Sequence, residues 1–250
     1  ESATVVGPAG EEIHTDELGR VRVHFHWDRE SQRNERSSCW MHVSQPWGGS
    51  GFGGTALPRI GQEVIVDFLG GDPDRPVIVG RLYTALQTTP YKLPDNKTQS
   101  GMRSRSSPGG SGDNYNEVMF EDRKGKELLR MQAEKDLHKL VKNDEKVKIG
   151  HDREKQVDHD DALVVGNDRS REVGRDERVK IGHDRTREVG RDESVKIGHD
   201  RTRTVDNDES IHVGADQSVS VTKNRTRTVG LNETVLIGLN NTRTVGMNET

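Results

Sequence analysis

Two histidines, His24 and His26, stand two residues apart and so share one face of an expected strand, an arrangement that can ligate a metal ion. No third ligand is marked near them, so a polar strand face or a subunit contact is the favoured interpretation. Three further histidines, His151, His183 and His199, recur after glycines, but arginines alternate with them at equivalent positions. We therefore expect no metal site and no cofactor.

Carboxylates and one thiol are the other groups with catalytic chemistry. Pairs such as Asp160 and Asp161 are the residue type that glycoside hydrolases use, but no sequence signal marks a pocket around them. The single cysteine, Cys39, lacks a Cys-His-Asn pattern and is interpreted as a packed strand residue. The sequence therefore predicts no catalytic residues and a protein that is not an enzyme.

The composition excludes several classes of protein. Of the 250 residues, 29% are hydrophobic and 32% are charged, values that approach the composition of disordered chains. A thin repeat rod has the same composition, and strict periodicity favours it. The net charge of −4 and the few aromatic residues give no signal for nucleic-acid binding. No apolar run is long enough to span a bilayer, and one cysteine excludes an internal disulfide framework.

An eight-residue repeat organises residues 139–250. Its unit is a Val or Ile, then a Gly, any residue, an Asp or Asn, and four mostly polar residues, and such a fixed period indicates a repeat architecture. The β-branched residues, expected to form a structural core, are Ile149, Val157, Val165, Val173, Ile181, Val189, Ile197, Val205, Val213, Val221, Val229, Ile237 and Val245. The glycines, expected to form corners, are Gly150, Gly166, Gly174, Gly182, Gly190, Gly198, Gly214, Gly230, Gly238 and Gly246. Asp158, Asp206 and Thr222 fill the remaining corner positions.

Each octad is predicted to be one short strand followed by one corner. A helix is disfavoured because each Gly costs about 1 kcal/mol against Ala, whereas Val and Ile favour strands. Gly tolerates a positive φ and Asp or Asn closes turns through its side chain, which suits a corner. A calcium-binding β-roll is rejected because its repeat is a nonapeptide with three glycines.

A second site lies two residues before each Val or Ile, on the same strand face. It alternates between apolar residues and cations, with one slip near residues 211–219. Two apolar side chains per octad bury too little surface to offset roughly 1–2 kcal/mol of ordering per residue. We therefore expect three intertwined chains that form a triangular β-prism, with outward charge pairs such as Glu172–Lys180 and Glu188–Lys196 between levels.

The N-terminal part is a different kind of sequence. Short alternating runs separated by Gly and Pro turns predict an OB-like β-barrel over residues 1–86, with a flexible loop at 47–54. Residues 87–116 have the Pro/Gly/Ser composition of a linker, and 117–138 are expected to be lead-in strands, with a helix at 133–137 as the competing interpretation. The octad-repeat shaft occupies 139–250 and stops in mid-repeat, so we expect a fragment truncated before its tip.

The barrel motifs then become recognisable. The segments GRVRVHFHWD at 19–28, WGG at 47–49, PRIGQEV at 58–64 and GDPDRP at 71–76 resemble the small barrel of VgrG, the valine–glycine repeat proteins of type VI secretion. The octads resemble the shaft of the same family and of the cell-puncturing spike of contractile-tail phages. This resemblance implies an all-β fold, an OB-like barrel followed by an intertwined trimeric β-helix.

The resemblance also implies partners and a location. It implies a homotrimer, a PAAR-repeat tip protein and an effector beyond the C-terminus, and a preceding region that meets the secretion tube and baseplate. The protein would be made in the bacterial cytoplasm, assembled on the apparatus, and secreted or injected through a target membrane.

The favoured function is a structural, membrane-puncturing spike component that delivers effectors. The alternatives are a β-solenoid enzyme, a spike with a fused polysaccharide or peptidoglycan hydrolase, and a phage tail spike.

Overall fold

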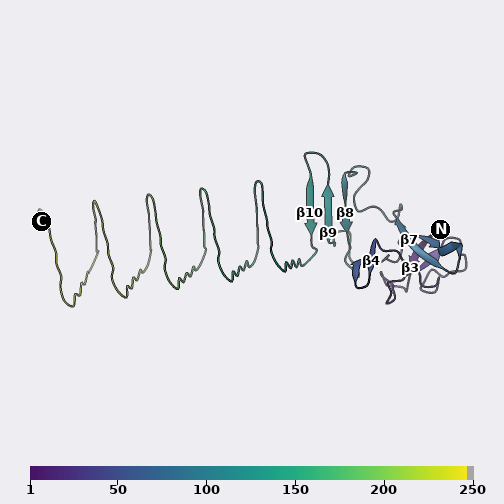
Figure 1. Ribbon diagram of the computed structural model, residues 1–250, viewed down its shortest axis with the longest axis horizontal. Coiled ribbons are helices and arrows are strands. Elements are labelled where there is room, and N and C mark those ends of the chain that lie inside the picture. Colours follow the sequence, from purple (N-terminus) through teal and green to yellow (C-terminus); the bar gives the residue numbers. More distant parts are fainter. Residues whose placement is uncertain (247–250) are drawn as a thin grey trace. The chain divides into compact units, whose positions relative to one another are not determined.

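The computed structural model describes residues 1–246, so the last four residues of the predicted shaft, 247–250, lie outside the described residues. The chain divides into two compact units, Glu1–Gln156 and Val157–Thr250, and each is described by itself (Figure 1). The described residues contain β-strands and one short 3-10 turn, η1 (Leu69–Gly71), but no α-helix. The all-β prediction is therefore confirmed, and the competing helix at 133–137 is wrong.

A five-stranded sheet forms the N-terminal part of the first unit, with strand order β2-β1-β6-β7-β3. All its neighbours pair antiparallel except β3 and β7, which are parallel. A bulge between Ile65 and Val66 shifts the register of the β6–β7 pair, and bulges of this kind bend a sheet. The strands are β1 (Ser2–Val6), β2 (Arg22–Phe25), β3 (His42–Val43), β6 (Glu63–Phe68) and β7 (Pro76–Leu82).

The core of this sheet is built from alternate strand positions. Val64 and Val66 of β6 are buried while Asp67 faces solvent, the period of two expected for a sheet with one covered face. The same core contains Ala3, Val5, Val21, Val23, Phe25, Met41 and Ile78. The alternating run at β6 therefore forms a strand with one face on the core, as such a run predicts.

A separate hairpin, β4 (Trp47–Gly49) and β5 (Phe52–Gly54), occupies the segment for which we expected a flexible loop. A Cβ atom on Gly53 would lie 2.4 Å from the carbonyl oxygen of Trp47, so only glycine allows the two strands to come this close. The rings of Trp47 and Phe52 meet edge to face at 6.1 Å. The loop prediction was wrong because glycine here permits close pairing of the backbone.

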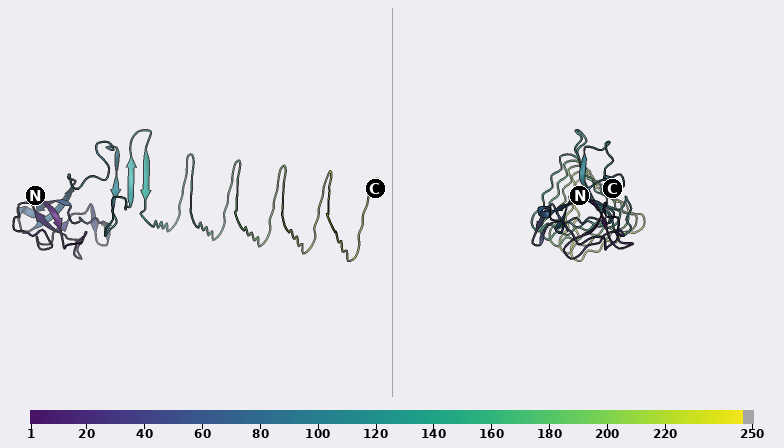
Figure 2. Two further views of the ribbon diagram at one scale, coloured as in Figure 1. Left: turned by 180° about the vertical axis from the view of Figure 1, so that it is seen from behind. Right: turned by 90° about the vertical axis from the view of Figure 1, so that its right-hand side faces the viewer.

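A three-stranded antiparallel sheet, order β10-β9-β8, follows in the first unit (Figure 2). Its strands are β8 (Gln99–Arg103), β9 (Glu117–Glu121) and β10 (Leu128–Gln132). β9 and β10 lie in the predicted lead-in range, whereas β8 lies inside the range with linker composition. We call these three strands the lead-in sheet.

The segment between β8 and β9 is tied back to the barrel region. The carboxylate of Glu12 accepts hydrogen bonds from Ser107 Oγ at 2.6 Å and from the Gly109 amide at 2.7 Å. Arg59 Nη2 donates to the carbonyl oxygen of Arg105 at 2.7 Å. Hydrogen bonds to charged groups are the stronger kind, so this Pro/Gly/Ser-rich segment is anchored.

Gly101 on β8 is a position where a side chain has no room. A Cβ there would lie 2.3 Å from the Val118 carbonyl oxygen and 2.6 Å from the Tyr91 hydroxyl. We expect Gly101→Ala to destabilise the first unit by about 1–3 kcal/mol, because β8 must move away from β9. Urea unfolding followed by tryptophan fluorescence measures this, with Gly112→Ala as the matched control because nothing lies within 4 Å of its added Cβ. Equal stability of the two variants would contradict the expectation.

The repeat segment, residues 139–246, has no paired strand in the single chain. Each corner position from Gly150 to Gly238 and the residue after it form a bend, and residues 157–246 wind as an open coil (Figure 1). A β-ladder needs a neighbouring strand for its N–H and C=O groups, and one open coil does not bring such a strand alongside. The bends recur with the predicted period of eight, but the short strand predicted for each octad is not formed in residues 139–246 of the single chain, because its hydrogen-bonding partner is lacking.

The corner glycines do not have the positive φ that we expected of them. The glycines of the described chain with positive φ all lie between residues 10 and 125. A Cβ atom on any corner glycine would also meet nothing within 4 Å. The argument from positive φ was therefore wrong, which explains why Asp158, Asp206 and Thr222 make the same bends.

We consequently expect Gly182→Asp to be tolerated. Aspartate already stands at two equivalent corners, so the free energy of unfolding should change by no more than about 0.5 kcal/mol. Thermal unfolding of the full chain measures this. A loss above about 2 kcal/mol would show that this corner differs from those at Asp158 and Asp206.

Candidate functional site

The first candidate site is the inner face of the repeat segment. The thirteen Val and Ile residues of the predicted core are between 42% and 50% exposed, and we call them the inner column. Other positions, such as His151, Asp152, His199 and Asp200, have side chains between 88% and 93% exposed. The inner column is thus the sheltered side of the coil, but half of each side chain remains open.

A continuous apolar column of this length is unusual on the surface of a single soluble chain, and such surfaces mark interaction sites. The second site adds to it, because its apolar members are between 59% and 67% exposed. These members are Val147, Leu163, Val179, Val195, Ile211, Val219 and Val235. The inner face therefore carries half-exposed apolar side chains in every octad of the described repeat.

At four arginines of the second site, the side chain pairs with an acid six residues later, across the corner. Nη1 of Arg187 lies 2.7 Å from Oε1 of Glu193. The equivalent pairs are Arg171–Glu177 at 2.9 Å, Arg203–Glu209 at 2.7 Å and Arg227–Glu233 at 2.7 Å. The outward charge pairs expected between levels of an assembled shaft, Glu172–Lys180 and Glu188–Lys196, stay a prediction. The sequence signal for the arginine pairs, which was not recognised, is the spacing of six between each arginine and its acid.

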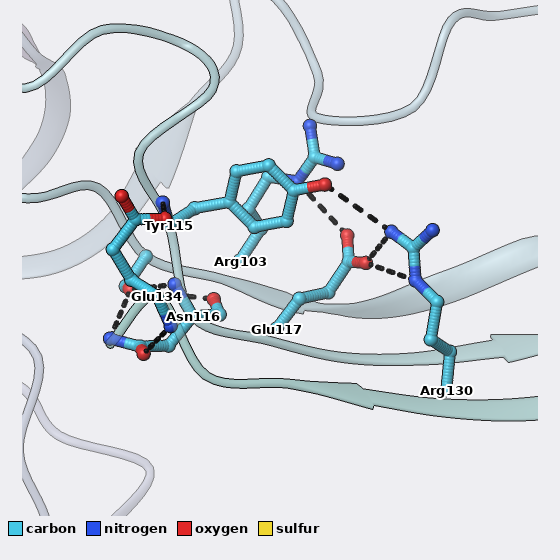
Figure 3. Close-up of polar contacts among 7 residues, drawn as sticks. Arg103, Tyr115, Asn116, Glu117, Arg130 and Glu134 are labelled. Atoms are coloured by element: carbon cyan, nitrogen blue, oxygen red, sulfur yellow. Dashed lines mark hydrogen bonds and ion pairs between the residues drawn. The ribbon is translucent and has the colours of Figure 1, made fainter. Parts of the chain in front are cut away.

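The second candidate site is a buried carboxylate in the lead-in sheet (Figure 3). Glu117 of β9 has a side chain with 0% exposure. Its Oε1 accepts a hydrogen bond from Nε of Arg103 on β8 at 2.9 Å, and its Oε2 accepts one from Nε of Arg130 on β10 at 3.0 Å and another from Nη2 of Arg130. One carboxylate therefore joins all three strands of the sheet.

An aromatic ring completes this cluster. The guanidinium of Arg103 lies 3.8 Å from the centre of the Tyr115 ring, within cation–π range. Nη2 of Arg130 donates to the Tyr115 hydroxyl at 3.4 Å. Burial raises the pKa of the nearby Tyr91 phenol, and the Glu117 carboxylate adds to this effect. Both arginines are therefore held by more than their ion pair.

A second carboxylate fixes the entry to the repeat. Glu134 accepts hydrogen bonds from Nδ2 of Asn114 at 2.8 Å and from the Tyr115 amide at 3.0 Å. Its own amide donates to Oδ1 of Asn116 at 2.9 Å (Figure 3). The chain is thus clamped where it leaves β10. The sequence analysis missed both clusters, although Glu117 stands two residues from buried Met119 on one strand face, which is the available signal.

The ionisation of Glu117 predicts a pH dependence. Burial opposes ionisation, but the hydrogen bonds from Arg130 and Arg103 outweigh it, so the pKa of Glu117 is lowered from 4.5. A lowered pKa in the folded state stabilises the fold above the unfolded pKa, and this contribution is lost as the pH falls. We expect the free energy of unfolding to fall as the pH drops below 4.5, and to fall less in Glu117→Gln. Urea titrations across this range would contradict this if both proteins responded equally.

The histidines first considered as metal ligands lie in two different settings, the barrel region and the repeat segment. His24 is buried, and Nε2 of His26 lies 2.7 Å from Oε1 of Glu63. Within residues 1–246, no group of three or more His, Cys, Asp or Glu side chains is placed to hold a metal ion. His151 and His199 each lie beside the aspartate that follows them.

Two further observations concern Cys39 and membranes. Cys39 is exposed and lies outside the strands, so its interpretation as a packed strand residue was wrong. No helix in the described part of the chain has the length and apolarity needed to cross a bilayer.

Both candidate sites lie in a part of the chain that matches a known domain. Residues 5–83 match the type VI secretion system/phage-baseplate injector OB domain. Residues 100–199 and 191–250, which together are more than half of the chain, match the bacteriophage T4 gp5 C-terminal trimerisation domain. The spike protein VgrG1a of Pseudomonas aeruginosa is 60% identical over 151 residues, which are 60% of this chain and 24% of that relative. The chain belongs to the VgrG family of spike proteins.

Other members of the VgrG family extend the comparison. VgrG1b of the same organism is 61% identical over 153 residues, which are 61% of this chain and 21% of that relative. The actin cross-linking toxin VgrG1 of Vibrio cholerae is 53% identical over 151 residues, 60% of this chain and 14% of that relative. The chain spans about a quarter or less of the length of these curated relatives. The resemblance to VgrG and to the phage puncturing device is confirmed.

Proposed function

We propose that this VgrG chain is a structural part of a membrane-puncturing spike and that three copies wind together through the repeat segment. The observation that carries the proposal is the half-exposed inner column, which gains cover only if further chains lie against it. The match of this segment to a trimerisation domain supports three copies. Each copy would supply one octad per face of a triangular β-prism.

Winding three chains explains the mechanical role. Neighbouring chains would pair the free N–H and C=O groups of every strand, so the shaft would expose no open edge along its length. The charged residues on the outer side would keep it from adhering to lipid. Interwound chains would also unfold slowly, and a slow rate of unfolding is the relevant stability for a spike under load.

The clamps at Glu117 and Glu134 fit the same role. They join β8, β9 and β10 and fix the chain where it leaves β10, so force on the barrel region would pass into the repeat through fixed hydrogen bonds. We propose the division into a barrel at 1–86, a connecting segment at 87–116, lead-in strands at 117–138 and a shaft at 139–250. The inner column and corner residues then act as structure and not as a catalytic centre.

We propose the remaining partners by family membership. A preceding region would meet the secretion tube and baseplate, and a PAAR-repeat tip protein and an effector would follow the shaft. The protein would be made in the bacterial cytoplasm and secreted or injected into a target cell. The toxin activity named for the Vibrio cholerae relative belongs to that protein, of which this chain covers 14%.

Secretion by the intact machine tests this function. The substitutions Ile181→Asp and Ile197→Asp in the full-length protein should abolish export of the tube protein, while the VgrG chain is still made. Gly182→Asp is the control and should export normally. Normal export by the double variant would show that the shaft does not need three-chain packing.

A further inference from the structure

The second site holds a cation in some octads and an apolar residue in the others, and both kinds of side chain lie on the inner face. Arginines at this site have side chains between 59% and 62% exposed, the range of its apolar members, and their acids are between 37% and 41% exposed. Both charged groups are far more sheltered than the positions that face outward. The ion pairs therefore belong to the inner face and not to the outer surface.

The kind of residue at the second site predicts the kind of residue six positions later, without exception. Wherever the site holds a cation, the residue six positions later is Asp or Glu, and wherever it is apolar, that residue is Arg, Gln or Asn. The slip at Ile211 and Val219 obeys the same rule, with Gln217 and Arg225 as the later residues. Octads of the repeat are thus of two kinds, ionic and apolar, and they alternate except at this slip.

We propose that the inner face of the repeat meets two further copies of the same chain in alternating apolar and ionic layers, with the doubled apolar layer at Ile211 and Val219 fixing the register. The inference rests on the proposed trimer and adds how its chains align. Three copies at one level would place three arginines and three acids together, which neutralises charge that the shaft encloses. Each guanidinium could then bond an acid of its own chain and one of a neighbour.

The doubled apolar layer distinguishes one register of the three chains from another, which a strictly alternating repeat cannot do. In a strictly alternating repeat, sliding one chain by sixteen residues would again place ionic octads on ionic ones. With the slip, that slide sets Arg203 against Val219 and Ile211 against Arg227, so it buries unpaired charge. Register is set in the same way by polar groups in coiled coils.

Mixing chains of opposite charge tests whether the ionic layers are shared. Arg187→Glu gives a chain with two acids at one level, and Glu193→Arg gives one with two cations. We expect each variant alone to form at least about tenfold less trimer, because like charges meet in the shaft. Refolding the two full-length chains together, with an affinity tag on one, should recover mixed trimers. Glu188→Arg, at the outward neighbour of Arg187, is the matched control and should assemble alone.

The outcomes separate this inference from the trimer itself. A monomeric parent chain would contradict both the proposed function and the proposed layers between chains. A trimeric parent whose Arg187→Glu variant assembles normally, or whose two variants gain nothing from mixing, would overturn the shared layers alone.

Deleting residues 215–222 tests the register. The deletion restores strict alternation, whereas deleting residues 183–198 keeps the doubled layer and is the control. Both proteins carry Cys39→Ser and one spin label, at Thr186→Cys in the first deletion and at Thr226→Cys in the control. We expect a single label-to-label distance in the control. The first deletion should add a longer distance, since a slide of two levels displaces the label by about 10 Å. A single distance in both would overturn the role of the doubled layer.

Discussion

Ile181→Asp combined with Ile197→Asp should leave the chain monomeric. In the proposed shaft these two positions put six carboxylates into a thin apolar core, and each buried charge without a partner costs several kcal/mol. In the single chain the same side chains are 46% and 48% exposed, so a monomer would carry the substitutions at little cost. The substitutions therefore act on assembly far more than on the fold of one chain.

Sedimentation measures this change directly, since the chain has a mass of 28.0 kDa. The matched control is Lys180→Asp combined with Lys196→Asp, which makes the same substitution at the outward neighbours. We expect the control to remain trimeric. A trimeric double isoleucine variant would mean that the inner column is not the interface.

Arg103→Met combined with Arg130→Met should be the most destabilising change in the lead-in sheet. It leaves the carboxylate of Glu117, whose side chain has 0% exposure, buried without either cation. Removing the partners of a buried charge typically costs about 3–5 kcal/mol. The lost hydrogen bonds should also raise the pKa of Glu117, so the variant should gain relative stability as the pH falls.

A third substitution separates the charge from the packing. Adding Glu117→Met removes the stranded carboxylate, and replacing a whole buried ionic cluster by apolar residues is often neutral or stabilising. Urea unfolding of the three proteins should therefore rank the parent and the triple variant above the double variant. If the triple variant were as unstable as the double, packing and not charge would dominate at this site.

The sequence alone predicted the period of the repeat and the range that contains β9 and β10, but not the buried cluster that joins them to β8, for a physical reason. The octad pattern is local, since each corner and each inner residue follows from its neighbours within eight positions. The Glu117 cluster joins residues that are 13 and 14 positions apart on three strands, so it depends on a pairing that no short motif marks. The clamp at Glu134 depends on the same sheet.

Three other predictions failed for similar reasons. The hairpin of Trp47 and Phe52 was hidden by glycines that usually indicate mobility but here allow close strands. Cys39 lies in a strand-like run, but the strand β3 begins only at His42 and the Cys39 side chain is exposed. The positive φ expected at the corners follows from the usual role of glycine, and aspartate and threonine at equivalent bends show that this role is not needed.

The mass of the full chain in solution tests the central claim most directly. Light scattering, with and without mild SDS, should give a trimer of about 84 kDa, three times 28.0 kDa, that survives the detergent because its chains are interwound. A folded monomer of 28.0 kDa would contradict the account, because the inner column would then have no partner and the shaft could not exist as described.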